Sequence, residues 1–310
     1  MLVLVAPGQG AQKPGLLTPW LELPGVADRI AQWSAATGLD LVRYGTEADA
    51  DEIRDTAVAQ PLLVAASLVS AGALLDGREV TEVAGAVAGH SVGELAAAAT
   101  AGVLSDADAM TLVTARGRAM AEAAAVTDTG MSAVVGGEPD AVVAHLEKLG
   151  LTAANINGGG QIVAAGTAAQ LAALTEDKPE KARVIPLKVA GAFHTSHMAP
   201  AVDAMAAAVE DVTVHDPVLP YVSNLDGAVV DDGQQVVRRL VGQVSASVRW
   251  DLCTETFQKM GVTALIEVCP GGTLTGLAKR GLPGVRTLAL KTPDDLDAAR
   301  ELIAEHTQTA

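Results

Sequence analysis

Short apolar runs alternate with longer runs of helix-forming residues along the first 123 residues of the chain. Residues 1–6 and 83–88 are of strand length and rich in small or branched side chains, whereas residues 95–101 are almost all strong helix formers. Parallel strands that are covered on both faces have this continuous apolar character, and their alternation with helices is typical of α/β proteins. The pattern therefore predicts a mostly parallel sheet wrapped by helices.

The pattern changes after residue 123. Strand-like and helix-like runs follow one another there, at residues 131–135 (strand), 139–149 (helix), 152–156 (strand), 161–165 (strand), 168–174 (helix) and 183–189 (strand). This β-α-β-β-α-β order is that of a ferredoxin-like unit. Later strand-like runs, near residues 262–268 and 288–290, return to the character of the first part. We therefore expect one core formed by residues 1–123 and 191–310, with residues 124–190 inserted as a ferredoxin-like small subdomain.

The composition narrows the range of partners. The 310 residues are 49% hydrophobic but only 2% aromatic, and 37 acidic against 21 basic side chains give a formal net charge of -16. Nucleic acids and anionic membranes bind basic or aromatic surfaces, so we expect neither as a partner. A chain without an aromatic patch or an exposed heptad repeat is also expected to be a monomer.

The longest apolar run, residues 61–75, falls short of the roughly 20 residues that span a bilayer. Pro61 is typical of the first position of a helix, so a buried helix that starts there is expected. The N-terminus lacks the basic segment and the apolar length of an export signal. Cys253 and Cys269 have neither a CxxC partner nor metal-ligand spacing, which favours inert core thiols and a cytoplasmic protein.

The stretch Gly89-His90-Ser91-Val92-Gly93-Glu94 carries the clearest chemical signal. It places a serine between two glycines, after a strand-like run and before a helix-like one, which is the arrangement of a nucleophile elbow. The sharp turn exposes the serine hydroxyl, and the glycines let strand and helix close around it. Ser91 is therefore the candidate nucleophile, and the core is expected to be α/β-hydrolase-like. The neighbouring His90 points elsewhere and is expected to pack or to form a hydrogen bond.

The general base has to come from a more distant histidine. His194 and His197 lie in a loop that follows a strand-like run and a Gly-Ala step. Catalytic groups are often carried on such loops, so His194 is favoured, and His197 is expected to begin or cap the next helix. The spacing of the two histidines could also indicate a metal, but no third ligand lies nearby in the sequence, so none is expected.

Arg116 lies on the apolar face of a helix whose start is predicted after Ser105. Positions 109, 113, 116 and 120 form one stripe at helical spacing. A guanidinium that faces the interior needs an anion, because an unpaired buried charge is very costly. A structural ion pair with an acidic residue and a bidentate clamp for a substrate carboxylate both meet this need.

A Gly-rich loop, residues 7–12, follows the first strand-like run. It lacks the third glycine of a dinucleotide-binding loop, and the chain has no P-loop, so a nucleotide cofactor is not expected. A loop at this place can instead direct backbone N–H groups toward the nucleophile. Gln9 is therefore a candidate oxyanion-hole residue.

Together these segments resemble the malonyl-CoA:acyl carrier protein transacylases, which are acyltransferases of fatty-acid and polyketide synthesis. The resemblance covers nearly the whole chain and rests on Gly8-Gln9-Gly10-Ala11-Gln12, Gln60-Pro61, the elbow, Arg116 and Gly191-Ala192-Phe193-His194. It implies transfer of the malonyl group from malonyl-CoA to the phosphopantetheine thiol of acyl carrier protein. The implied route is ping-pong through a malonyl-serine, with malonyl-CoA and acyl carrier protein as partners and no cofactor.

The resemblance also implies catalytic roles. Ser91 attacks the thioester, and His194 acts first as general base and then as general acid. The backbone N–H groups of Gln9 and Val92 form the oxyanion hole. The main-chain carbonyl of Gln243 orients the histidine, in place of the acidic residue of a triad.

Two further residues are implied to bind the acyl group. Arg116 pairs with the free malonyl carboxylate, and Phe193 matches the malonyl-selecting form of its motif, in which the ring crowds an α-methyl branch. The chain departs from the family pattern at Ala246-Ser247, where Asn-Pro is usual, and at Cys269, where glycine is usual. Neither departure is expected to touch a reacting atom.

The main alternative is an esterase or thioesterase of the α/β-hydrolase type, which shares the elbow and the acyl-serine. That class predicts a triad acid and an HGGG-type oxyanion loop, and neither is evident in the sequence. Arg116 discriminates between the two readings, because a carboxylate clamp has no use in a general esterase.

Overall fold

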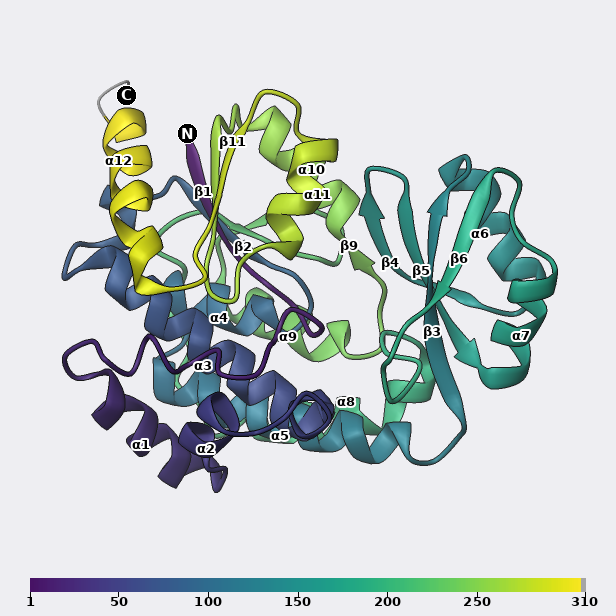
Figure 1. Ribbon diagram of the computed structural model, residues 1–310, viewed down its shortest axis with the longest axis horizontal. Helices are drawn as coiled ribbons and strands as arrows, with labels where there is room; N and C mark the ends of the chain where they lie inside the picture. Colours follow the sequence, from purple (N-terminus) through teal and green to yellow (C-terminus); the bar gives the residue numbers. More distant parts are fainter. Residues whose placement is uncertain (308–310) are drawn as a thin grey trace.

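Two β-sheets form the framework of the computed structural model, which describes residues 1–307 (Figure 1). The larger sheet has six strands in the order β11-β10-β1-β2-β7-β8. Its strands are β1 (Leu2–Ala6), β2 (Ala86–Gly89), β7 (Tyr221–Val222), β8 (Val229–Val230), β10 (Ala264–Glu267) and β11 (Arg286–Ala289). Neighbouring strands are parallel except at the β7–β8 edge. The predicted α/β fold with a mostly parallel sheet is confirmed.

Helices cover both faces of this sheet. They are α1 (Val26–Thr37), α2 (Leu41–Thr46), α3 (Thr56–Leu75), α4 (Gly93–Thr100), α5 (Asp106–Ala124), α8 (Ala199–Val209), α9 (Gly233–Gln243), α10 (Trp250–Lys259), α11 (Thr273–Gly281) and α12 (Leu296–Thr307). Short 3₁₀ turns are η1 (Glu52–Arg54), η2 (Val80–Glu82), η3 (Ser196–Met198) and η4 (Pro293–Asp295). On β1, Leu2 and Leu4 belong to the core cluster that holds α3, α4 and α5, whereas Val3 and Val5 belong to the cluster of α10 and α11. The strand is continuously apolar because both of its faces are covered.

The most apolar helix is a core element. By length and composition α3 could cross a membrane, but 83% of its apolar window is buried inside the fold. The predicted buried helix is therefore confirmed, although it starts earlier than the sequence pattern indicates. Asp55 caps the helix by accepting a hydrogen bond from the Ala57 amide, so Pro61 lies inside the helix and not at its first position. A proline there removes one backbone hydrogen bond of the helix.

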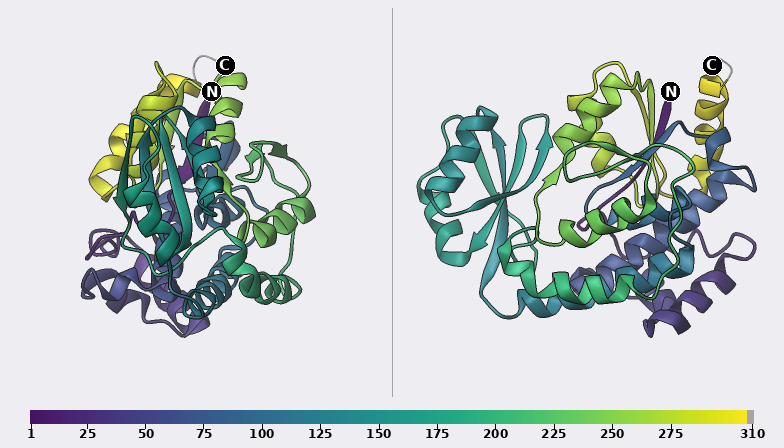
Figure 2. Two further views of the ribbon diagram at one scale, coloured as in Figure 1. Left: turned by 90° about the vertical axis from the view of Figure 1, so that its right-hand side faces the viewer. Right: turned by 180° about the vertical axis from the view of Figure 1, so that it is seen from behind.

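The second sheet is antiparallel within the predicted ferredoxin-like segment. Its elements are β3 (Thr129–Gly136), α6 (Pro139–Lys148), β4 (Thr152–Gly158), β5 (Gln161–Thr167), α7 (Ala168–Glu176) and β6 (Ala182–Pro186). The strand order β6-β3-β5-β4 follows from two β-α-β connections joined by a hairpin. Figure 2 shows this sheet, with α6 and α7, at one end of the molecule. The boundaries at residues 124 and 190 stay a prediction.

A strand from a distant part of the chain completes the second sheet. Here β9 (Val248–Arg249) runs parallel to β4, with Val248 paired to Asn155. The segment that contains the Ala246-Ser247 departure therefore leads from α9 of the core directly to this edge. This strand links the two sheets beside the candidate site, and the sequence pattern does not indicate it.

Candidate active site

Ser91 lies in a turn that requires glycine on both sides. Strand β2 ends at Gly89, and α4 begins at Gly93. A Cβ atom on Gly89 would lie 2.0 Å from the backbone carbon of Gly93, and one on Gly93 would lie 2.3 Å from the carbonyl oxygen of Ala6. Ser91 itself adopts the left-handed region, with φ at 54°. Strain of this kind persists where surrounding contacts hold the residue, and it is concentrated at functional sites.

The loop after β6 brings His194 to this serine. The Nε2 atom of His194 lies 2.7 Å from the Oγ atom of Ser91, and its Nδ1 atom lies 2.9 Å from the carbonyl oxygen of Gln243. A carbonyl oxygen can only accept, so Nδ1 carries the proton and Nε2 can accept from the serine hydroxyl. The structure thus brings together the residues to which the sequence assigns the roles of nucleophile, base and orienting carbonyl.

The electrostatic environment keeps His194 neutral. Burial lowers the pKa of His194 to about 3, and the positive charge of Arg116 acts in the same direction. Like Ser91, His194 has a left-handed backbone, with φ at 61°. At neutral pH its imidazole is therefore available as a proton acceptor.

Arg116 is fully buried beside Ser91 and is held by uncharged groups. Its guanidinium donates to the side-chain oxygens of Gln60 and Gln243, each at 2.6 Å, and lies 3.3 Å from Ser91 Oγ. Within residues 1–307 it forms no ion pair with a carboxylate. Burial lowers its pKa to about 10, and Glu94 partly opposes this effect. The structural ion pair considered from the sequence is thus not formed, and the positive charge remains available to an anion.

The Gly-rich loop after β1 lies against the elbow. A Cβ atom on Gly8 would lie 2.8 Å from the carbonyl oxygen of His90, so the loop approaches the turn closely. The Gln9 side chain is turned away and donates to Thr56 Oγ1 at 3.2 Å. In the described residues 1–307, neither the Gln9 nor the Val92 backbone N–H donates a hydrogen bond to another protein group. These two amides are therefore available for an external acceptor.

A small cleft opens beside Ser91 and His194. Its core side is formed by Gln9, Gln60, His90, Ser91, Met120, Phe193 and His194, and its second-sheet side by Met131, Asn155, Val163, Leu187 and Val189. His90 is not part of the catalytic pair: its Nε2 atom lies 2.9 Å from Asn157 Oδ1, and its ring packs on Trp250. The Oδ1 atom of Asn155 is buried and accepts no hydrogen bond within the described residues.

Sequence reasoning assigned no role to three residues that support the site. Gln60 holds Arg116, and Asn224 Oδ1 accepts from the Ser91 backbone N–H at 2.7 Å. Glu94, although part of the elbow motif, received no role; it is fully buried and accepts from the Asn224 backbone N–H at 2.7 Å. A charged residue in the first turn of an otherwise apolar helix was an available signal for Glu94. No comparable signal marks Asn224, which follows a two-residue strand.

The remaining candidate groups carry no reactive arrangement. Cys253 and Cys269 are buried and unpaired by disulfide, and burial raises the pKa of both thiols, that of Cys269 to about 12. This agrees with the prediction of core thiols. Across residues 1–307, no three His, Cys, Asp or Glu side chains lie close enough together to hold a metal ion.

Comparison with known proteins places this chain in a family. The model of the acyl transferase domain family matches residues 3–295. The malonyl CoA-acyl carrier protein transacylase of Mycobacterium tuberculosis is 52% identical over 307 residues, which cover 97% of this chain and 100% of that protein. The crystal structure of MCAT from the same organism, at 52% identity, has a TM-score of 0.92 and covers 96% of this chain and 99% of that chain.

A third relative was solved with a carrier protein. The structure described as PlMCAT:AntF (holo), a type II PKS acyl-carrier protein in complex with its malonyl-transacylase, has a TM-score of 0.89 at 29% identity. It covers 97% of this chain and 99% of that chain. Fold, elbow and family model together define an enzyme of the acyltransferase class. Within that class, the chain belongs to the malonyl CoA-acyl carrier protein transacylase family.

Proposed function

We propose that this enzyme transfers malonyl from malonyl-CoA to acyl carrier protein through a malonyl ester on Ser91. The observation that carries the proposal is the buried guanidinium of Arg116, held by two neutral amide oxygens and 3.3 Å from the serine hydroxyl. An unsubstituted acyl group such as acetyl carries no anion that could pair with this positive charge. It matches an acyl group that ends in a carboxylate, which can take both arms of the guanidinium.

The first half-reaction follows from the geometry. Ser91 Oγ attacks the thioester carbon while its proton moves to Nε2 of His194, 2.7 Å away. The free N–H groups of Gln9 and Val92 bind the oxygen that becomes negative in the tetrahedral intermediate. The carbon–sulfur bond then breaks, and the departing CoA thiolate receives the proton from His194. Malonyl-Ser91 and free CoA result.

The second half-reaction runs the same steps in reverse order with a different thiol. The phosphopantetheine thiol of the carrier protein gives its proton to His194 and attacks the malonyl ester. Ser91 leaves and recovers the proton, so neutral enzyme and malonyl carrier protein are formed. Throughout, the Gln243 carbonyl holds Nδ1–H at 2.9 Å and fixes the imidazole tautomer.

Residues that line the cleft can contact both the acyl group and the pantetheine arm of the substrate. Phe193 is buried next to His194 and lines the cleft, where its ring would crowd an α-methyl branch on the acyl group. Asn155, on the opposite side, presents an amide oxygen without a partner. Both CoA and the carrier protein bring a pantetheine arm that carries amide N–H groups. We assign Asn155 Oδ1 as an acceptor for one of them, since an unmatched buried acceptor is costly.

The competing esterase or thioesterase differs in which acceptor takes the acyl group. We expect the wild-type protein to form malonyl carrier protein from malonyl-CoA and holo carrier protein, followed by gel shift or mass spectrometry. Ser91→Ala is expected to lower this rate by roughly 10⁵-fold, because loss of a serine nucleophile removes the whole covalent route. Release of free malonate at the rate of CoA formation, with no malonyl carrier protein, would instead establish a thioesterase.

A further inference from the structure

Glu94 is a buried acidic side chain directly behind the elbow whose contacts the proposed mechanism does not use. It is 1% exposed and lies in the first turn of α4, two residues after the oxyanion-hole candidate Val92. Its Oε1 atom accepts from the Asn224 backbone N–H at 2.7 Å, and its Oε2 atom accepts from Nε2 of Gln243. Both partners are donors, so the carboxylate matches them and a group that must donate does not.

The two partners lead directly to the reacting groups. Gln243 Nε2 also donates to the Ser91 carbonyl at 3.0 Å, while its Oε1 atom accepts from Arg116 at 2.6 Å. A side-chain amide has one donating and one accepting end. The two acceptors at its NH₂ group, the Glu94 carboxylate and the Ser91 carbonyl, therefore orient the amide so that its oxygen faces the guanidinium.

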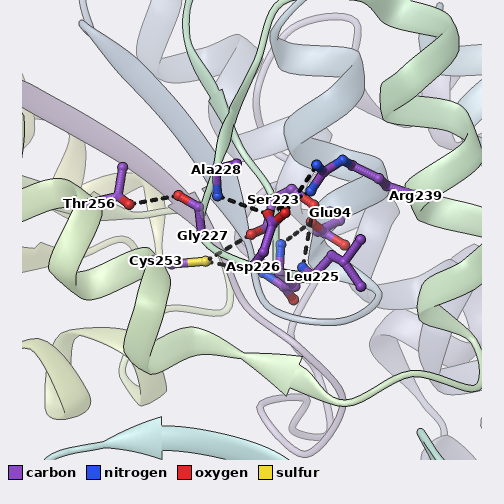
Figure 3. A network of polar contacts seen from close by, with 10 residues as sticks. Glu94, Ser223, Leu225, Asp226, Gly227, Ala228, Arg239, Cys253 and Thr256 are labelled. Carbon is purple, nitrogen blue, oxygen red and sulfur yellow. Dashed lines mark hydrogen bonds and ion pairs between the residues drawn. The ribbon is translucent and has the colours of Figure 1, made fainter.

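The other partner, Asn224, begins the turn of residues 224–227, whose polar contacts Figure 3 shows. Asn224 donates from Nδ2 to the Gly89 carbonyl at 2.6 Å and accepts at Oδ1 from the Ser91 backbone N–H at 2.7 Å, so it brackets the elbow. The turn is fixed by contacts that use its own neighbours: Asp226 pairs with Arg239, and Thr256 donates to the Gly227 carbonyl at 2.6 Å. A backbone N–H in such a turn cannot reverse its polarity, whereas the Gln243 amide can rotate.

We propose that Glu94 is a positioning residue for malonyl selectivity: its carboxylate fixes the orientation of the Gln243 amide, and through it the guanidinium of Arg116. The inference rests on the proposed function, because Arg116 is assigned there to the malonyl carboxylate. Glu94 touches no reacting atom. Its effect reaches the substrate through one amide and one guanidinium.

The test is Glu94→Gln, which keeps the size and removes the second acceptor. The Asn224 backbone N–H keeps the remaining oxygen, so the new NH₂ group faces Gln243 and turns its amide. Gln243 then presents a donor to Arg116. We expect the ratio of malonyl-CoA to acetyl-CoA loading, as kcat/KM for acyl-Ser91 formation at about pH 8, to fall roughly 10-fold, the effect of one lost hydrogen bond to a charged group.

Two matched variants separate positioning from a general structural role. Glu267→Gln removes another buried carboxylate, which accepts from the backbone N–H groups of Gly272, Leu274 and Thr275 at the start of α11. It is expected to lower stability while leaving the malonyl-to-acetyl ratio unchanged. Glu94→Asp keeps an acceptor-only carboxylate and is expected to retain most of the wild-type malonyl-to-acetyl ratio.

The outcomes distinguish this inference from the function on which it rests. Equal losses of malonyl and acetyl loading in Glu94→Gln, or an unchanged ratio in a folded variant, would overturn the positioning role. Failure of the wild-type protein to form malonyl-Ser91 would overturn the proposed function itself. If Glu94→Gln does not fold, the test uses Glu94→Asp and Gln243→Ala. Glu94→Asp must then lower the malonyl-to-acetyl ratio, but to a smaller extent than Gln243→Ala does. A wild-type ratio in both Glu94→Asp and Gln243→Ala would contradict the proposal.

Discussion

The two sides of the cleft are built in different ways. The core side holds Ser91 and His194, both with left-handed backbones, and the buried charge of Arg116 lies beneath it. The second-sheet side offers apolar side chains from the antiparallel strands and from the segment after β6, and one unmatched amide oxygen, on Asn155. Strained and charged groups thus lie together on one side. The other side can shape and bind the substrate without taking part in bond changes.

This difference follows from what each sheet can support. Parallel strands buried on both faces end at one edge, where loops from distant parts of the chain meet and can hold a strained residue through many contacts. Asn224, Gln243 and Gly93 all fix the position of Ser91 in this way. The antiparallel sheet has its strands connected locally and adds only β9 from elsewhere. Variants on the two sides should therefore change different kinetic constants.

The largest contrast is expected for Arg116→Ala on the core side. Loss of the guanidinium should lower malonyl loading by roughly 100-fold or more, since a buried hydrogen-bonded charge pair is worth about 2–5 kcal/mol. Acetyl loading, which needs no clamp, should stay equal or rise. Rapid-quench measurement of acyl-Ser91 formation from both thioesters checks this. Arg116→Lys keeps the charge but loses the planar fork, so its rate of malonyl loading should lie between those of wild type and Arg116→Ala. Equal losses of malonyl and acetyl loading in Arg116→Ala would contradict the role of Arg116 as a carboxylate clamp.

A smaller effect is expected for Asn155→Ala on the second-sheet side. One neutral hydrogen bond to the pantetheine arm is lost, so KM for malonyl-CoA should rise about 3- to 10-fold while kcat stays near the wild-type value. Steady-state transfer kinetics at saturating carrier protein measure both constants. Val163→Ala, a change of apolar shape on the same side, serves as the control. A fall in kcat without a change in KM would show that the division between the two sides is wrong.

The third effect concerns stability, and it should be confined to the core side. Burial raises the pKa of Glu94 from 4.5 to about 7 and lowers the pKa of His194 from 6.5 to about 3. The stability due to the raised pKa of Glu94 is fully present below 4.5 and is lost as pH rises through about 7. The stability due to the lowered pKa of His194 is present above 6.5 and is lost as pH falls toward 3.

These two contributions oppose each other between about pH 8 and about pH 5. Glu94→Gln removes one of them, so lowering the pH over this range should cost the variant about 2 kcal/mol of unfolding free energy relative to wild type. Urea unfolding of both proteins at the two pH values gives this difference. The second-sheet residues that line the cleft carry no titratable side chain, so Asn155→Ala should follow the wild-type pH dependence. A difference in unfolding free energy between Glu94→Gln and wild type that is the same at both pH values would contradict the raised pKa of Glu94.

The sequence predicts local features of this molecule better than contacts between distant segments. The elbow, the capped helix after Ser105 and the order of the ferredoxin-like elements each depend on neighbouring residues, and all are present. The predicted start of α3 at Pro61 was wrong, because Asp55 caps the helix and starts it five residues earlier, at Thr56. The strand β9, only two residues long, depends on pairing with β4 and leaves no periodic pattern.

The site shows the same division. Ser91 and Arg116 could be singled out from motif and helical periodicity, because each violates a simple pattern of its own segment. That Arg116 is satisfied by Gln60 and Gln243, and not by an acidic residue, depends on side chains from α3 and α9 meeting α5. The support from Asn224 likewise depends on a turn 133 positions away from Ser91. No local sequence pattern indicates such contacts between distant segments.

The most direct test of the account is the intact mass of the protein after brief mixing with malonyl-CoA in the absence of carrier protein. We predict a mass gain equal to one malonyl group, located on Ser91 by peptide mapping. The gain should be absent in Ser91→Ala and should disappear when holo carrier protein is added. A wild-type protein that releases CoA at the same rate but never gains this mass, or that carries the group on another residue, would contradict the malonyl-serine route.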